Sequence, residues 1–224
     1  MRGIYVITDK DLCPGRSHLD IALAAVEAGA CCVQLRDKSL CGRELVETAR
    51  SIRCAVMSGR VKFIVNDRMD VALAVGADGV HLGQDDIPVS SARAVMGEDA
   101  IIGVSVASVE EAVRGENDGA SYVAVGSVFA TATKTDAGVP VGLEMITAVK
   151  QAVGVPVVAI GGINIENVAL VAQAGADAAA VLGRHRRTDV PRVGLAADPG
   201  VDLLDGRVVH PDYHLLRVGA AAGT

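Results

Sequence analysis

Short apolar runs alternate along the chain with longer stretches in which apolar residues recur every three or four positions. The runs are rich in Val and Ile and predict strands at residues 3–8, 31–36, 61–66, 79–82, 101–105, 122–126, 156–160 and 178–182. The stretches between them predict helices, with one buried face formed by Leu19, Ala22, Leu23 and Val26 and another by Leu45, Ala49, Ile52 and Val56. Strands that alternate with helices in this way are typical of an α/β fold with a parallel sheet.

A Gly-Ala pair ends every second predicted helix, at Gly29, Gly76, Gly119 and Gly175. Glycine suits the left-handed turn that ends a helix, and four such repeats of two strand-helix units predict eight strands closed into a TIM (β/α)8 barrel. The rival fold is an open, doubly wound sheet, which usually carries a glycine fingerprint after its first strand. Residues 5–11 contain no such fingerprint.

The last part of the chain breaks the alternation. Residues 1–183 form the predicted barrel domain, whereas residues 184–224 contain Pro191, Pro199 and Pro211 among scattered glycines and show no helical face. We therefore expect an irregular C-terminal tail and no closing eighth helix in the usual place. A basic interaction arm that starts at Arg184 is the alternative.

Composition narrows the functional classes. Half of the 224 residues are hydrophobic, enough for one large core, and the net charge of -6 argues against a general nucleic-acid binder. Five cysteines without Cys-x-x-Cys spacing suggest neither a disulfide framework nor a zinc site. No secretory leader and no apolar run of the ~20 residues needed to span a membrane is visible. These features predict a cytoplasmic protein that binds neither nucleic acid nor a membrane, and they leave the oligomeric state open.

Polar residues cluster where the predicted strands end, and in a parallel barrel those ends meet at one rim. At the end of the second strand the two-residue period places Gln34, Arg36 and Lys38 on one face. Two cations and an amide that point the same way suit a pyrophosphate group. The alternative is a solvated strand end with Arg36 paired to Asp37.

Carboxylates follow the next two strands. Asp67 comes after Asn66 at the end of the third strand, and Asp86 follows the fourth. Either one could simply cap the next helix. Magnesium, however, takes a few carboxylate and water oxygens and completes its shell with substrate phosphates, so the pair predicts a Mg2+ site that faces the cations of the second strand.

Candidate phosphate contacts lie after the last three strands. Thr131, Thr133 and Lys134 belong to a long loop after the sixth strand, while Gly162 and Gly183 fall where phosphate-binding barrels present backbone amides. Ordinary turns would explain the same residues. His81 lies inside a strand and is expected to be a packed core residue, and no nucleophile with an adjacent base is apparent at the rim.

Seven stretches in order resemble the thiamine phosphate synthase family. They are Tyr5-Val-Ile-Thr-Asp9, Gln34-Leu-Arg-Asp-Lys38, Ile64-Val-Asn-Asp-Arg68, Gly76-Ala-Asp-Gly-Val-His-Leu-Gly-Gln84, Gly103-Val-Ser105, Thr131-Ala-Thr-Lys134 and Ala159-Ile-Gly-Gly-Ile163. Each stretch alone is weak evidence, whereas seven in family order across residues 3–183 are specific.

The resemblance implies a Mg-dependent transferase that joins 4-amino-2-methyl-5-(diphosphooxymethyl)pyrimidine to a thiazole phosphate, releasing pyrophosphate and thiamine phosphate. In the family's mechanism the C–O bond breaks first, and the thiazole nitrogen captures the resulting pyrimidine methyl cation. Carried over residue by residue, the resemblance implies pyrimidine binding by Gln34 and Asn66 and magnesium binding by Asp67 and Asp86. It implies diphosphate binding by Arg36, Lys38 and Lys134, with Ser105 close to the diphosphate, and thiazole phosphate binding by Thr131, Thr133, Gly162, Leu182 and Gly183.

The chain departs from the family pattern after Gly183. Relatives continue with a Ser-Ala-Ile-like segment and a closing helix, whereas this chain continues with Arg184-His-Arg-Arg187. A reading-frame artefact or a recent replacement would explain the change, and sequencing the DNA around codon 183 tests the first explanation. Two other functions stay open: an inactive phosphate-binding or regulatory barrel, and a thiazole tautomerase. Relatives of the second kind carry a His where this chain has Ala107.

Lys134 tests the predicted electrostatic catalysis. By analogy with the loss of one oxyanion-hole donor, Lys134→Ala should raise the barrier by ~3 kcal/mol, or slow turnover by about two orders of magnitude. Steady-state turnover of the variant measures the effect. An unchanged rate would remove Lys134 from the mechanism.

Overall fold

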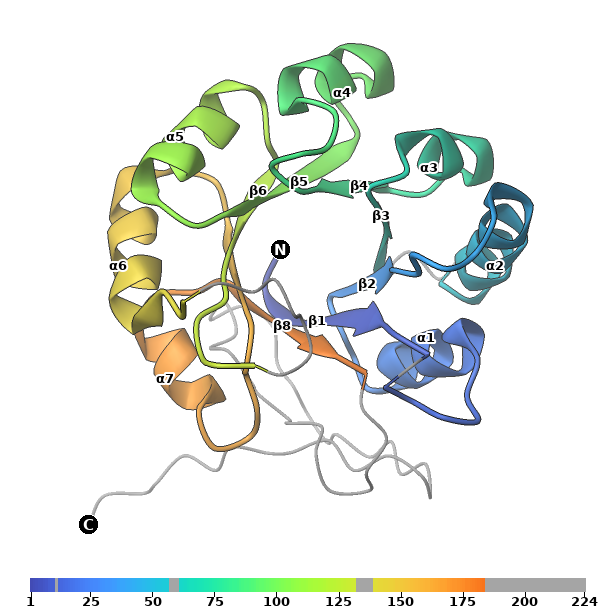
Figure 1. Cartoon of the computed structure of the whole chain (residues 1–224), viewed down its shortest axis with the longest axis horizontal. Helices are drawn as coiled ribbons and strands as arrows, with labels where there is room; N and C mark the ends of the chain where they lie inside the picture. The colour runs from blue at the N-terminus through green and yellow to red at the C-terminus, as the bar shows by residue number, and fades with distance from the viewer. Residues whose placement is uncertain (11, 57–60, 132–138, 184–224) are drawn as a thin grey trace, which may run out of the picture.

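Eight parallel strands form a closed barrel in chain order, and β1 pairs with β8 to complete it (Figure 1). The structure is a computed structural model that describes residues 1–10, 12–56, 61–131 and 139–183. The strands are β1 (Gly3–Thr8), β2 (Cys32–Leu35), β3 (Lys62–Asn66), β4 (Gly79–Leu82), β5 (Ile101–Val106), β6 (Tyr122–Val125), β7 (Val157–Ile160) and β8 (Ala178–Leu182). The predicted barrel is therefore confirmed, and the open-sheet alternative is wrong.

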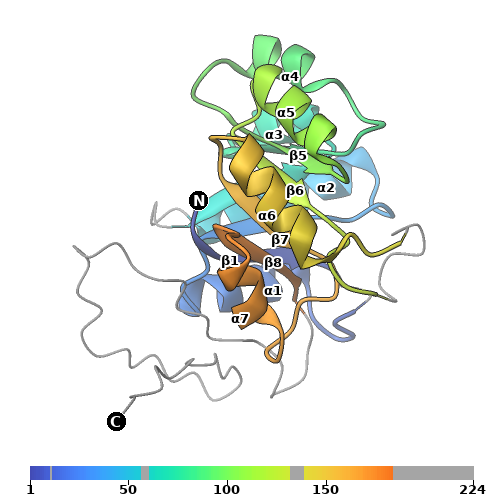
Figure 2. The same cartoon turned by 90° about the vertical axis from the view of Figure 1, so that its left-hand side faces the viewer.

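Helices alternate with the strands and surround the barrel. In the described part of the chain they are α1 (His18–Glu27), α2 (Gly42–Ala55), α3 (Met69–Val75), α4 (Val89–Met96), α5 (Val109–Asn117), α6 (Gly142–Ala152) and α7 (Val168–Gln173). Figure 2 shows α5, α6 and α7 side by side against the outer surface of the strands. The glycines of the four Gly-Ala pairs all have positive φ, between 61° and 102°, as the left-handed turn requires.

The strands separate two hydrophobic clusters because successive side chains point to opposite faces. Side chains from Val33, Phe63, Val80 and other outward positions join the core beneath the helices. Tyr5, Cys32, Ile64 and Tyr122 belong to a second cluster, which fills the barrel. Inward positions at the carboxyl ends of the strands therefore open onto the rim.

One predicted helix face is wrong in detail. On α1 the buried residues include Ile21, Ala22 and Ala25, whereas Leu23 is exposed. The buried face of this helix is centred on Ile21 and Ala25, and Leu23 lies outside that face. The face predicted for α2 is confirmed, since Leu45, Ala49, Ile52 and Val56 are all buried.

The expected tail, residues 184–224, lies outside the described residues. Among the residues that are described, no helix combines the length and the apolar character needed to cross a membrane. In this part of the chain α7 packs on β8 and α1 packs on β1, and no helix follows β8 to lie between them.

Glycine inside the barrel makes room for tyrosine. A Cβ atom at Gly103 would lie 2.0 Å from Cζ of Tyr122, far inside van der Waals contact. The Tyr122 ring fills this space and is only 1% exposed. Packing at this level of the barrel therefore depends on the missing side chain at position 103.

Gly103→Ala should destabilise the protein by about 3 kcal/mol, since the buried Tyr122 ring would have to move. Gly76→Ala is the control: Gly76 has a left-handed backbone with φ of 61° and ψ of 40°, and its Cβ would meet nothing within 4 Å. This control should cost only ~1 kcal/mol of backbone strain. Urea unfolding of the two variants measures the difference, and equal losses would contradict this account of the barrel interior.

Candidate functional site

The predicted rim residues line one cavity at the carboxyl ends of the strands. The cavity has a volume of about 1140 Å3 and also extends along the outer face of β1 beside α1. Its lining includes Gln34, Arg36, Lys38, Asn66, Asp67, Asp86, Ser105, Thr131, Gly162, Leu182 and Gly183. The structure thus brings together every predicted site residue that it describes. Thr133 and Lys134 lie outside the described residues.

The second strand presents its polar residues as the two-residue period predicts. Gln34 is buried inside the barrel, and Arg36 and Lys38 follow it along the cavity wall. Nη1 of Arg36 lies 3.7 Å from Oδ2 of Asp9, and Nζ of Lys38 lies 4.0 Å from Oδ2 of Asp67. Among the described residues Asp37 pairs with Lys10 and His18 and not with Arg36, so the predicted alternative of an Arg36–Asp37 pair is wrong.

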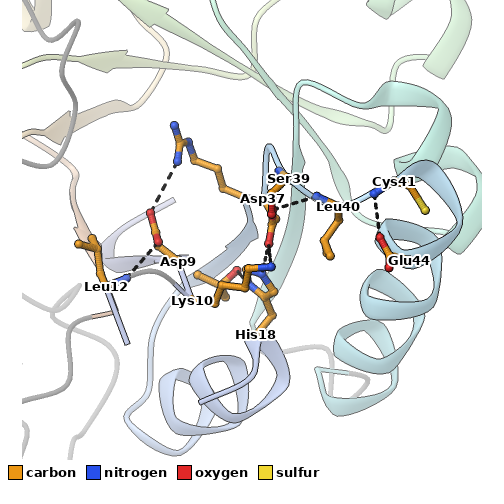
Figure 3. Close-up of polar contacts among 11 residues, drawn as sticks. Asp9, Lys10, Leu12, His18, Asp37, Ser39, Leu40, Cys41 and Glu44 are labelled. Atoms are coloured by element: carbon orange, nitrogen blue, oxygen red, sulfur yellow. Dashed lines mark hydrogen bonds and ion pairs between the residues drawn. The ribbon is translucent and has the colours of Figure 1, made fainter. Parts of the chain in front are cut away.

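Asp37 anchors the loop that carries these cations (Figure 3). Its carboxylate lies 3.0 Å from Nε2 of His18 and 3.2 Å from Nζ of Lys10, and it accepts hydrogen bonds from Ser39 and the Leu40 amide. Burial alone would raise its pKa, but the hydrogen bonds from Ser39, His18 and Lys10 outweigh burial and hold the pKa well below its usual range. The loop therefore has a fixed acidic anchor below Arg36 and Lys38.

Neither Asp67 nor Asp86 caps a helix. The N-cap positions of α3 and α4 are Arg68 and Pro88, and neither makes a side-chain capping bond. Oδ2 of Asp86 instead accepts the Gly83 amide at 2.6 Å. Asp67 has a left-handed backbone with φ of 59°, and its amide donates to the carbonyl of His81. Capping, the alternative explanation for both residues, is therefore wrong.

The two carboxylates lie against each other. Burial, a hydrogen bond with Asp86 and the negative charge of Asp86 together raise the pKa of Asp67 to about 6, while Lys38 and Arg36 act in the opposite direction. Asp67 therefore keeps its proton to a higher pH than an isolated aspartic acid does. This arrangement has the oxygen donors and the charge of a divalent-cation site.

A buried hydrogen-bond network lies beneath the cavity, and sequence reasoning did not find it. Gln34 Nε2 donates to the Tyr5 hydroxyl at 2.8 Å, and this hydroxyl lies 2.9 Å from that of Tyr122. The Tyr122 hydroxyl lies 2.9 Å from Nδ1 of His81, whose Nε2 lies 2.9 Å from Oγ of Ser105. We call these five residues the core network.

His81 is buried, as predicted, but it also lines the cavity. Its contact with Ser105 corrects the expectation that no nucleophile would meet a base at the rim. The contact lacks an orienting carboxylate, because the other ring nitrogen faces the phenol of Tyr122. Burial lowers the pKa of His81 to about 4, so at neutral pH the imidazole is uncharged and a weak base.

The predicted phosphate contacts differ in what they offer. Gly161 and Gly162 both have positive φ and turn the chain directly after β7, beside Ala130 and Thr131 at the cavity. The Gly183 amide, in contrast, already donates to the Ile7 carbonyl at 3.0 Å. Gly183 therefore contributes to barrel closure as well as to the cavity wall.

The fold and the site define a (β/α)8-barrel enzyme whose rim combines cations with paired acids. The family model described as thiamine monophosphate synthase matches residues 4–184. The chain belongs to the thiamine monophosphate synthase family and is an enzyme of that type.

Comparison with individual relatives supports the same family. The chain is 51% identical over 180 residues to the thiamine-phosphate synthase of Methanospirillum hungatei, covering 80% of this chain and 87% of the relative. It is 49% identical to that of Moorella thermoacetica, covering 80% and 85%. The thiamine phosphate pyrophosphorylase structure from Pyrococcus furiosus matches with a TM-score of 0.73 and 42% identity, covering 80% and 85%. An N-acetylmannosamine-6-phosphate 2-epimerase from Clostridium perfringens, at 17% identity and a TM-score of 0.62 over 81% and 86%, shares the fold alone.

The pKa of Asp67 predicts how stability depends on pH. A carboxyl whose pKa is about 6 when folded, against an ordinary value of 3.8, binds more protons in the folded state between those values. Stability without metal should therefore fall as the pH rises from about 4 to 6 and stay reduced above that window. Asp67→Asn should raise Tm at pH 7.5 by roughly 2 to 4 °C, which corresponds to about 1 kcal/mol after solvent screening.

The control for this prediction is Asp85→Asn, which removes a neighbouring exposed carboxylate. Calorimetry in a chelator should show the Asp67→Asn gain at pH 7.5 and its loss at pH 4. A gain of the same size at both pH values would instead point to backbone strain.

Proposed function

We propose that this enzyme joins 4-amino-2-methyl-5-(diphosphooxymethyl)pyrimidine to a thiazole phosphate, giving thiamine phosphate and pyrophosphate with the aid of Mg2+. The observation that carries the proposal is the Asp67–Asp86 pair opposite Arg36 and Lys38 on one rim. A diphosphate that binds together with a divalent cation needs positively charged side chains and carboxylates at the same place. Family membership supports the same reaction.

The proposed roles of the side chains differ with their charge and position. Arg36 and Lys38 would hold the diphosphate as negative charge builds on it, and we assign Lys134 to the same task. Gln34 and Asn66, deeper in the barrel, would orient the pyrimidine ring. Thr131, Thr133, Gly162, Leu182 and Gly183 would form the thiazole phosphate subsite.

The proposed reaction is a dissociative substitution. The bond between the methylene carbon and the diphosphate oxygen breaks, and both electrons leave with pyrophosphate. The ring amino group stabilises the resulting cation, and the thiazole nitrogen donates its electron pair to form the new C–N bond. No protein nucleophile is needed, which agrees with the weak basicity of His81; catalysis then depends on electrostatics and positioning.

The residues present fit magnesium. Two adjacent carboxylates give oxygen ligands, and the described residues contain no cluster of three or more His, Cys, Asp or Glu that would form a complete protein cage. This donor set suits Mg2+, which keeps water and completes its shell with substrate phosphates. When bound, the ion neutralises charge on the departing diphosphate. Asp67 and Asp86 would hold it.

The structure disfavours the tautomerase alternative. The position that carries His in that group is Ala107, which lines the cavity and has no side-chain proton to offer. The diphosphate cations have no evident use in an isomerisation. We therefore give the synthase reaction alone as the proposed function.

Release of pyrophosphate tests the proposal. The full chain with both substrates and Mg2+ should release pyrophosphate in step with thiamine phosphate, and EDTA should stop it. Asp86→Asn should lower the rate by about two orders of magnitude, or ~3 kcal/mol, since one of two carboxylate ligands is lost.

Asp99→Asn, which removes an exposed carboxylate outside the cavity, is the matched control and should leave the rate near that of the unmodified enzyme. Binding of either substrate without turnover would instead identify an inactive phosphate-binding barrel. Turnover that persists in EDTA would remove the metal from the proposal.

A further inference from the structure

The core network crosses the barrel interior and joins two places on the cavity wall. It starts at Gln34 on β2, passes through Tyr5 on β1 and Tyr122 on β6, and reaches Ser105 on β5 through His81 on β4. Gln34, His81 and Ser105 line the cavity, whereas the two tyrosines lie below it. The network therefore has two ends that substrates can reach and a middle that they cannot.

Packing holds the middle of the network in place. The rings of Tyr5 and Tyr122 meet edge to face with centroids 6.0 Å apart, and His81 stacks on Tyr122 at 5.6 Å. Tyr5 and Tyr122 are 2% and 1% exposed. The thiol of Cys32 also contacts the Tyr5 hydroxyl. In the described residues no buried side-chain nitrogen or oxygen lacks a hydrogen-bond partner, so the network is complete.

Each inner member can donate in one direction only. A phenol has one hydrogen, and an uncharged imidazole has one N–H. One direction begins with Nε2–H of His81 donating to Ser105. Nδ1 of His81 then accepts from the Tyr122 hydroxyl, the Tyr122 oxygen accepts from Tyr5, and the Tyr5 oxygen accepts from Gln34 Nε2.

The direction of the network fixes what both ends offer to the cavity. In this direction Ser105 accepts from His81 and keeps its hydroxyl hydrogen for a ligand, while Gln34 keeps its carbonyl oxygen as an acceptor. If the direction were reversed, Ser105 would offer an acceptor and Gln34 a donor. A ligand that makes Ser105 the donor therefore also makes Gln34 a donor to Tyr5.

We propose that the core network couples the two halves of the pyrimidine diphosphate site, so that an anion at Ser105 sets Gln34 to accept from an amino group on the ring. This inference rests on the proposed function for the placement of the two groups. A diphosphate only accepts hydrogen bonds, so it selects the direction in which Ser105 donates. The same direction turns the Gln34 carbonyl toward the ring.

The inference gives Tyr5, Tyr122 and His81 a positioning role. None of them needs to touch the reacting atoms. In this direction Nε2 of His81 carries a hydrogen and donates it to Ser105, so it cannot take the serine proton. The Ser105–His81 contact thus orients a hydroxyl donor and does not activate a nucleophile.

Binding measurements test the coupling without turnover. The probes are inorganic pyrophosphate with Mg2+ and 4-amino-5-hydroxymethyl-2-methylpyrimidine, followed by calorimetric titration. In the unmodified enzyme pyrophosphate should tighten pyrimidine binding about fivefold or more, and the pyrimidine should tighten pyrophosphate binding equally. Tyr122→Phe and Tyr5→Phe should each abolish this effect, and the double variant should lose no more than either single one.

A matched control removes a hydroxyl elsewhere. Ser121 donates and accepts hydrogen bonds at the amino end of the barrel, with Arg93 and Ala100 among its partners. Ser121→Ala should keep the full coupling. Coupling that survives in both Tyr→Phe variants, or that is absent from the unmodified enzyme, would overturn the inference.

A second measurement needs no variant. With 15N-labelled histidine, His81 should show the Nε2–H tautomer in the pyrophosphate complex, and the Nδ1–H tautomer would overturn the inference. The outcome is separate from that of the proposed function. Coupling without turnover would reject the function alone, and turnover without coupling would reject the inference alone.

Discussion

The hydrogen-bonded register between β1 and β8 is the constraint on which the rest of the structure depends. Five residue pairs, from Gly3 with Ala178 to Ile7 with Leu182, close the sheet into a ring. Once it is closed, inward positions of neighbouring strands fall at matching heights, as with Asn66 beside His81 and Ser105 beside Ala124. The site is the upper layer of these inward positions, and a register shift of one residue would turn it outward.

Much of this architecture could be predicted because it depends on local periodicity. The strand ranges differ from the predicted ones by a residue or so, and the face shared by Gln34, Arg36 and Lys38 follows from strand geometry alone. Because parallel strand ends meet at one rim, the order of the strands is enough to predict that Asp67 and Asp86 lie together. The spacing alone does not indicate what each site residue binds, and the resemblance to the family implies those roles.

The missed features depend on contacts between distant parts of the chain. Tyr5 and Tyr122 are 117 residues apart and meet only because both rings point into the barrel. Arg36 pairs with Asp9 from the first strand end, although Asp37 is its sequence neighbour. The exposed position of Leu23 depends on how closely α1 approaches the barrel. A sequence pattern gives the face of a side chain but not the partner that it meets there.

The left-handed backbone of Asp67 limits how this position can vary. A φ of 59° is tolerated by Asp, Asn and Gly but costs most other residues a substantial strain energy. Glutamate would preserve the charge, but it adopts this left-handed backbone at a higher energy, and its longer side chain would place the carboxylate differently. Under the proposed magnesium-binding role of Asp67, a lineage that loses the metal should therefore drift here to asparagine or glycine, and that replacement would mark lost catalysis among barrels of otherwise intact sequence.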